Sequence, residues 1–181
     1  MSCTTEWIIK SNKEDKKSIV DRLLEIRGIK DEDAKREFLH PLEITLTHPN
    51  AFCDMQKAVN RIVKAIDEKE NILIYGDFDA DGVTSTSVLM KTISFLGGVV
   101  DYYIPDRDTE GHGLNSKALV KLMALKKPKL IITVDNGISS TEEIKFVNSF
   151  GRDIIITDHH EAPDELPEAY AIINPKAMNS L

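Results

Sequence analysis

Three aspartates occupy alternate positions in the segment ILIYGDFDADGVTSTSVL, residues 72–89. They are Asp77, Asp79 and Asp81, and acidic clusters of this type commonly bind metal ions. An EF-hand calcium loop would need an incoming helix and a glutamate at its twelfth position, but an apolar run precedes Asp77 and the twelfth residue is Val88. The calcium loop is therefore excluded. Two interpretations are left, metal ligation and a turn that caps the next helix.

Further candidate ligands follow two other apolar runs of the chain. Asp135 comes directly after LIITV, and Asp158, His159 and His160 come directly after IIIT. If these runs are parallel strands, their carboxyl ends meet at one edge of the sheet, which is where open α/β sheets bind ligands. A capping turn explains any one of these aspartates, but it does not predict ligand-type residues after three strands. The pattern therefore predicts a metal site.

The types of side chain indicate which cation this site would take. Carboxylates outnumber imidazoles and cysteine is absent, which favours Mn²⁺ or Mg²⁺ over a structural zinc. Two such cations about 3.5 to 4 Å apart lower the pKa of a bound water and neutralise a phosphoester under attack. The formal net charge of −7 excludes nonspecific attraction of nucleic acid by a basic surface, so the cations would meet the phosphate.

A second polar segment, IPDRDTEGHGLN at residues 104–115, also carries groups that suit a phosphate. Arg107 offers a planar fork for phosphate oxygens, His112 is a further donor, and Gly111 and Gly113 allow backbone amides to approach an anion. Alone, the segment is typical of a loop before a capped helix. Beside the acidic cluster, the phosphate-binding interpretation is favoured.

The elements that must position these residues alternate between strand and helix from about residue 54 onward. Strands are predicted at 72–76, 99–104, 130–134, 154–157 and 171–173, and helices at 54–69, 84–96, 115–125 and 141–149. This alternation predicts an α/β fold with a mostly parallel five-stranded sheet and helices on both faces. Residues 1–50 form a separate helical arm with helices at 13–27 and 31–39, and residues 51–181 form the main domain.

Other features of the composition limit the class of protein. Cys3 and Cys53 have neither metal-ligand spacing nor a disulfide framework. The sequence has no apolar run long enough to span a bilayer and no signal-peptide pattern at its start. We therefore expect a cytoplasmic protein without a membrane partner.

Several motifs in order resemble those of a known superfamily. The segments YGDFDADGVTST, YYIPDRDTEGHGL, IITVDNGIS, ITDHH and INPK are similar to successive motifs of the DHH phosphoesterases. Within that superfamily they resemble the N-terminal catalytic core of the RecJ family of single-stranded-DNA-specific exonucleases, over residues 54–176. The resemblance implies a DHH domain that hydrolyses phosphodiesters from the 5′ end of single-stranded DNA in repair and recombination. It also implies two Mn²⁺ or Mg²⁺ ions, with a single-strand-binding protein or a helicase as possible protein partners.

The resemblance assigns roles to individual residues. It implies that Asp77 and Asp79 bind different cations, that Asp135 bridges both, and that His159 is the histidine ligand. Asp81 is implied to be a further ligand or a neighbour of one, and Asp158 to orient His159. His160 would face the scissile phosphate as a catalytic group together with Asp135, while Arg107 and His112, with Gly111 and Gly113, would hold a phosphate of the nucleic acid.

The sequence departs from the superfamily pattern at two places. Many members have a histidine four residues before the first motif aspartate, where this chain has Leu73, so the shell of one cation differs. The superfamily's fourth motif adds another aspartate and a second domain after the DHH signature, and Asp153 and Asp164 are not placed to substitute for it. We therefore expect the chain to be a fragment that ends before that motif and is weakly active or inactive by itself.

Two other functions stay open on the sequence alone. A DHH phosphodiesterase could act on short oligonucleotides or cyclic dinucleotides, although RDTEGHGL resembles the exonuclease branch. A catalytically silent relative could instead act as a scaffold in replication or repair, but such relatives tend to lose the ligand residues that this chain retains.

Overall fold

The computed structural model describes residues 17–41 and 48–177, and it divides the chain into two compact units, Met1–Thr47 and His48–Leu181. In the first unit, α1 (Ile19–Ile26) and α2 (Glu32–Leu39) are separated by a short turn. The Asp31 side chain caps α2 by accepting hydrogen bonds from the backbone N–H groups of Asp33 and Ala34. The described part of the arm thus contains two helices, and residues 13–16 of the first predicted helix lie outside the described residues.

The second unit alternates strands and helices, as predicted. Its elements are η2 (Pro49–Ala51), α3 (Met55–Asp67), β1 (Asn71–Tyr75), α4 (Ala80–Phe95), β2 (Val99–Tyr103), α5 (Arg107–Glu110), α6 (Ser116–Lys126), β3 (Leu130–Val134), α7 (Thr141–Ser149), β4 (Asp153–Thr157) and β5 (Ala171–Ile173). Among the described residues, no helix is both long enough and apolar enough to cross a membrane.

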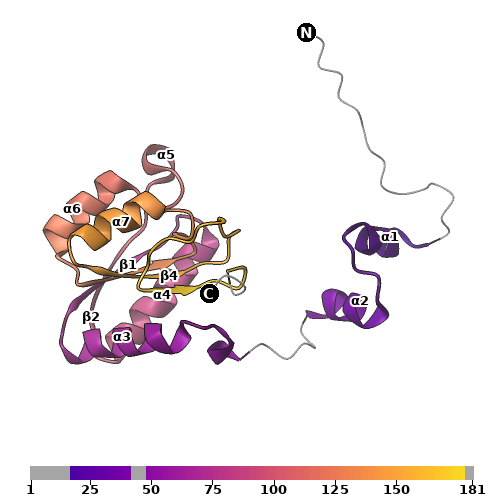
Figure 1. Cartoon of the computed structure of the whole chain (residues 1–181), viewed down its shortest axis with the longest axis horizontal. Helices are drawn as coiled ribbons and strands as arrows, with labels where there is room; N and C mark the ends of the chain where they lie inside the picture. The colour runs from indigo at the N-terminus through magenta and orange to yellow at the C-terminus, as the bar shows by residue number, and fades with distance from the viewer. Residues whose placement is uncertain (1–16, 42–47, 178–181) are drawn as a thin grey trace, which may run out of the picture. The chain divides into compact units, whose positions relative to one another are not determined.

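All five strands pair in parallel, in the order β2-β1-β3-β4-β5. Helices α6 and α7 cover one face of the sheet, and α3 and α4 cover the other (Figure 1). The register pairs Tyr75 with Tyr103 and with Thr133, so the carboxyl ends of the central strands lie level with one another. The α/β fold with helices on both faces is confirmed.

The core is made by strand residues that alternate between these two faces. In β1, Leu73 and Tyr75 point to the layer of α6 and α7, whereas Ile72 and Ile74 point to the layer of α3 and α4. All four are at most 1 % exposed. Because both faces of the central strands are covered, β1, β3 and β4 are mainly apolar, and this is why the sequence identifies them so clearly, whereas the edge strand β2 is partly exposed and contains Asp101.

The start of α4 differs from the prediction. We expected the helix to begin near residue 84, but it begins at Ala80 with Asp79 as the cap. The hydroxyls of Thr84 and Ser85 donate to the carbonyls of Ala80 and Asp81 one turn earlier, at 2.7 and 2.6 Å. Serine and threonine hydroxyls inside a helix commonly donate to a carbonyl one turn earlier, so these residues do not identify where the helix begins.

Asp54 connects α3 to the edge strand β5. Although it occupies the N-cap position of α3, its side chain makes no capping bond, and Oδ2 accepts the backbone N–H of Ile172 at 2.9 Å. We predict that Asp54→Ala lowers the free energy of unfolding by about 1 to 2 kcal/mol, because it leaves a buried N–H without a partner. Chemical denaturation followed by circular dichroism measures this. Asp67→Ala, at the exposed end of α3, should change little, and equal effects would contradict the role of Asp54.

Candidate metal centre

The first acidic motif is placed by the end of β1 and the start of α4. Asp77 follows β1 after Gly76 and is only 5 % exposed. Asp79 caps α4, and its Oδ1 accepts the N–H groups of Asp81 and Gly82, both at 3.0 Å. The capping interpretation of this motif is therefore correct for Asp79. It does not compete with metal ligation, because a carboxylate has a second oxygen.

Asp135 follows β3 in a backbone conformation that is rare for a residue with a side chain. Its φ is +62°, in the left-handed region, and the residue is 9 % exposed. Its backbone N–H is held by the carbonyl of Thr157 on β4 at 2.9 Å. Non-glycine residues in this region cluster at functional sites, where the surrounding structure enforces the conformation. At Asp135 this conformation turns the chain immediately after β3, at the edge of the sheet where the strands end.

Two clusters of possible ligand atoms share Asp135. In one, Asp77, Asp79 and Asp135 each offer an oxygen, and the three atoms lie within 4.8 Å of one another. In the other, Asp135, His159 and His160 offer an oxygen and two ring nitrogens within the same limit. This donor set fits a divalent cation such as Mn²⁺ or Mg²⁺ in each cluster. We expected His160 to face the substrate, and it also lies close enough to be a ligand.

The electrostatics of the metal-free site reflect this concentration of carboxylates. Burial and the negative charge of Asp79 raise the pKa of Asp135 above its usual value. The backbone N–H of Gly82 is the main cause that lowers the pKa of Asp79. His159 Nε2 lies 2.9 Å from Asp135 Oδ1, and this contact partly compensates the buried charge. A bound cation would therefore stabilise the ionised form of Asp135.

Asp158 has a different partner from the one we expected. The resemblance implied that it orients His159, but its Oδ1 lies 2.7 Å from Nδ1 of His160. His159 contacts Asp158 through its backbone N–H, which donates to Oδ1 at 2.7 Å, and not through its ring. The reason is the turn after β4, which wraps the backbone around the carboxylate, so that the N–H of Ile138 at 3.0 Å completes its set of donors.

The Asp158 contacts also affect two pKa values. Burial opposes the charge of Asp158, but the donors from Ile138 and His160 together lower its pKa below the usual value. The hydrogen bond between the Asp158 carboxylate and the His160 ring also raises the pKa of His160. His160 is therefore held by an anionic partner in a fixed orientation, with its Nε2 atom directed away from that partner.

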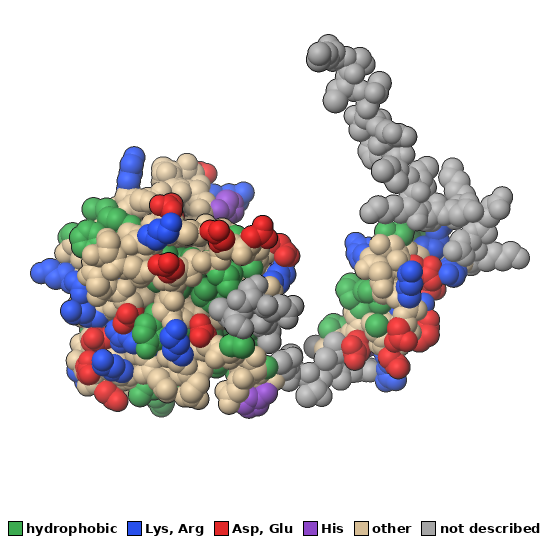
Figure 2. Space-filling model, viewed as in Figure 1, with side chains coloured by type: hydrophobic (Ala, Val, Ile, Leu, Met, Phe, Trp, Pro, Cys, Tyr) green, Lys and Arg blue, Asp and Glu red, His purple; other side chains and the backbone are tan. Residues whose placement is uncertain are grey.

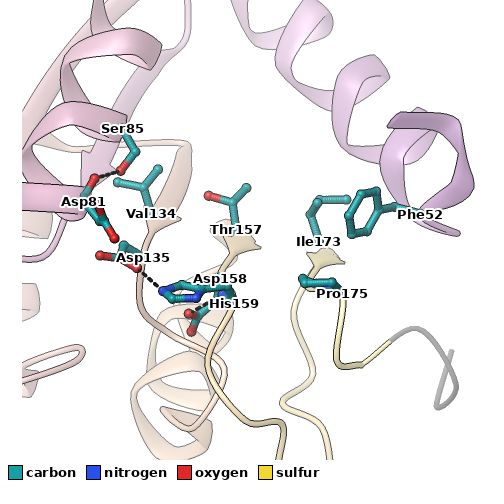
Figure 3. Close-up of a pocket in the computed structure, with 10 residues that line it drawn as sticks. All are labelled: Phe52, Asp81, Ser85, Val134, Asp135, Thr157, Asp158, His159, Ile173 and Pro175. Atoms are coloured by element: carbon teal, nitrogen blue, oxygen red, sulfur yellow. Dashed lines mark hydrogen bonds and ion pairs between the residues drawn. The ribbon is translucent and has the colours of Figure 1, made fainter. Parts of the chain in front are cut away.

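A cavity of about 360 Å³ adjoins Asp135 and His159 (Figure 3). Figure 3 shows Asp135 and His159 facing each other, and Phe52 and Ile173 on the far side of the cavity. Asp81 lines this cavity but belongs to neither cluster of ligand atoms among the described residues. The structure therefore places Asp81 beside the site without bringing its carboxylate into contact range of a shared cation.

Two of the phosphate-binding candidates, His112 and Gly113, line a second cavity of about 480 Å³, which is also lined by Asp135 and His160. His112 Nδ1 is 3.8 Å from Asp77 Oδ2. Arg107 does not touch the carboxylates; its guanidinium lies over the ring of Phe78, 5.4 Å from the centroid. Gly111 and Gly113 both have positive φ, +75° and +79°, which explains why this tight loop uses glycine.

Sequence reasoning missed Phe78 and the residues that line the second cavity after Asp135. The Phe78 ring also contacts His112, with 4.6 Å between ring centroids, so it holds both phosphate-binding candidates. The sequence indicated a role for Phe78 only by its position between Asp77 and Asp79. Asn136, Gly137, Ser139 and Ser140 line the cavity because the chain turns inward after β3, which no local pattern shows.

Comparison with known proteins agrees with this geometry. The model of the DHH family, N-terminal domain, matches residues 71–180, a range that includes every acidic and histidine residue of the two clusters. The chain belongs to the DHH family. The DHH signature itself is Asp158-His159-His160, at the end of β4.

Several relatives are single-stranded-DNA-specific exonucleases named RecJ. The protein from Bacillus subtilis (strain 168) is 46 % identical over 158 residues, which cover 87 % of this chain and 20 % of the relative. The Haemophilus influenzae protein is 39 % identical, with 87 % of this chain and 27 % of the relative covered. A crystal structure of exonuclease RecJ bound to manganese superposes with a TM-score of 0.64 at 30 % identity, covering 70 % of this chain and 32 % of that one.

The DHH unit shows both signs of charge across its surface. Figure 2 shows acidic and basic side chains scattered over the viewed face of residues 48–177, without a continuous basic patch on the coloured part. This distribution agrees with the formal net charge of −7. Any attraction of this face for a polyanion therefore depends on local groups.

Proposed function

We propose that this chain carries the metal-dependent phosphodiesterase centre of a single-stranded-DNA-specific exonuclease that works from the 5′ end in DNA repair and recombination. The observation that carries the proposal is the pair of ligand clusters that share Asp135. The similarity to RecJ proteins supports the substrate. The chain spans 20 % and 27 % of the length of those two relatives, so the activity of the whole protein belongs to this proposal.

The residues of the two clusters would hold two Mn²⁺ or Mg²⁺ ions, and the manganese in the related RecJ structure supports this choice. When bound, such ions lower the pKa of a water molecule and neutralise negative charge on a phosphate. Asp135 would contact both ions, Asp77 and Asp79 would each bind a different ion, and His159 would be the histidine ligand. Asp81 would remain beside the site, and Leu73 is buried in the core, away from any ligand role.

His160 suits a catalytic role beside these ligands. Its side chain is 57 % exposed, its Nδ1 is held by Asp158, and its raised pKa favours the protonated ring. A protonated imidazole fixed in this way can donate a hydrogen bond to a phosphate oxygen or a proton to a leaving group. Arg107, His112 and the backbone at Gly111 and Gly113 would contact the neighbouring phosphate of the strand.

The experiment that tests this function compares substrates with the chain itself. We expect slow cleavage of 5′-labelled single-stranded DNA in Mn²⁺, less cleavage of duplex DNA and of dinucleotides, and none in the presence of a chelator. Preference for dinucleotides would indicate the other class of DHH phosphodiesterase. Binding of single strands without any metal-dependent cleavage would favour a scaffold, and rapid processive cleavage would contradict our expectation of slow cleavage.

A further inference from the structure

The loop that carries Arg107 and His112 is held at its base by two tyrosines on adjacent strands. Tyr75 ends β1, Tyr103 ends β2, and their paired positions bring the rings to a centroid distance of 5.3 Å. Tyr75 is fully buried and Tyr103 partly buried. Both side chains point into the layer of α6, directly below the loop.

The hydroxyl of Tyr103 binds the first half of this loop through Glu110. It lies 2.7 Å from each carboxylate oxygen of Glu110, and Glu110 Oε2 also accepts the backbone N–H of Asp106 at 3.1 Å. One carboxylate thus connects the end of β2 to both ends of α5. Hydrogen bonds to an ionised carboxylate are roughly twice as strong as neutral ones.

The hydroxyl of Tyr75 binds the second half of the loop. It accepts the backbone N–H of Asn115 at 3.1 Å, and the Asn115 side chain in turn donates to the carbonyl of Glu110 at 3.4 Å. Burial raises the pKa of Tyr75 to about 12, and burial and Glu110 raise that of Tyr103, so both hydroxyls stay neutral at ordinary pH. The hydrogen bonds of Tyr103 and Tyr75 therefore hold the two halves of the short segment that contains Arg107 and His112.

Positioning matters here because the two candidate side chains are themselves exposed. The His112 side chain is 76 % exposed, and Arg107 is exposed as well. Among the described residues, His112 contacts Asp77 and the ring of Phe78. Arg107 contacts the ring of Phe78. A long exposed side chain loses rotamer freedom when it binds a ligand, and a prearranged one loses less.

We propose that Tyr103 and Glu110 are positioning residues, which hold α5 and the following turn so that Arg107 and His112 stay packed on Phe78 beside the metal-binding edge. The benefit of this arrangement for a phosphate ligand rests on the proposed function. The arrangement itself rests on the hydrogen bonds of Glu110 and can be measured without a substrate.

The test uses Tyr103→Phe, which removes one hydroxyl, with Tyr102→Phe as the matched control on the opposite face of β2, where the ring is 54 % exposed. We expect the ring-proton NMR signals of His112, assigned by their loss in His112→Gln, to lose the shift that the Phe78 ring causes. We also expect about fivefold weaker binding of a 5′-phosphorylated, phosphorothioate-linked single strand in Mn²⁺. The affinity for Mn²⁺ itself should stay unchanged, as should all three readouts in Tyr102→Phe.

Variants at Glu110 separate positioning from a general loss of structure. Glu110→Ala should reproduce the effects of Tyr103→Phe, and Glu110→Gln, which keeps an acceptor for the tyrosine hydroxyl, should recover most of the wild-type values. Unchanged His112 signals and unchanged binding in Tyr103→Phe would overturn the inference. If the signals move but Arg107→Ala and His112→Ala bind the strand like the wild type, the positioning holds and the proposed phosphate contacts are wrong.

Discussion

Replacing Asp135 by Asn should weaken Mn²⁺ binding more than about 100-fold and reduce any phosphodiester hydrolysis by about 10³-fold or more. The reason is that Asp135 is the member common to both ligand clusters, so one change affects both cations. Asparagine is the appropriate replacement because it keeps the shape of the side chain. It also tolerates the left-handed backbone at φ +62°, whereas alanine would add strain.

The same substitution should affect stability in the opposite direction. Burial and the charge of Asp79 raise the pKa of Asp135, which means that the metal-free fold disfavours the ionised form. Above the usual pKa of an aspartate, ionised Asp135 therefore destabilises the metal-free chain, and a neutral asparagine removes this penalty. We expect the metal-free variant to unfold at a higher denaturant concentration than the wild type. Added Mn²⁺ should stabilise only the wild type.

The matched control is Asp81→Asn, four residues before Ser85 in the same cavity wall. Because Asp81 belongs to neither ligand cluster among the described residues, its substitution should change Mn²⁺ affinity less than about tenfold. Titration calorimetry of the two variants measures both effects. Wild-type affinity in Asp135→Asn would refute the shared-ligand geometry, and an equal loss in Asp81→Asn would add Asp81 to the ligands.

The sheet could be predicted because its physics is local in sequence. Runs such as Ile72–Tyr75 and Leu130–Val134 are mainly apolar and almost fully buried, since both faces of each strand are covered. Once the strands were known to be parallel, the rule that their carboxyl ends share an edge was sufficient to bring Asp77, Asp135 and His159 together. The structure places possible ligand atoms of these residues within 4.8 Å of one another in two clusters, and their binding of cations stays a prediction.

The contacts between loops could not be predicted, because they join residues that are far apart in sequence or depend on the direction of one turn. Phe78 and Arg107 come from different strand ends, and only the fold shows that the ring lies under the guanidinium. The contact of Asp158 with the His160 ring could not be predicted for the second reason. The ring centroids of His159 and His160 lie 4.6 Å apart, and the path of the chain after β4 decides which ring the Asp158 carboxylate meets.

Gly82→Ala should lower the free energy of unfolding by about 3 kcal/mol, although helix propensity by itself predicts a gain of about 1 kcal/mol. Gly82 lies in the first turn of α4, where a Cβ atom would stand 2.4 Å from the backbone oxygen of Asp77 and 2.6 Å from its carbonyl carbon. Backbone atoms at the end of a buried strand cannot move aside like a flexible side chain. The helix would have to shift away from Asp77 instead.

This shift should also weaken the metal centre, because the Gly82 N–H holds Asp79 and the Gly82 Cα packs on Asp77. Gly151→Ala is the control: φ there is +63° but no atom lies within 4 Å of the new Cβ, so it should cost about 1 kcal/mol and leave Mn²⁺ affinity unchanged. Chemical denaturation and metal titration of both variants give the answer. A stabilised Gly82→Ala variant would mean that propensity outweighs the close approach of α4 to Asp77, and that the geometry of the first acidic motif tolerates a wider separation than the structure has.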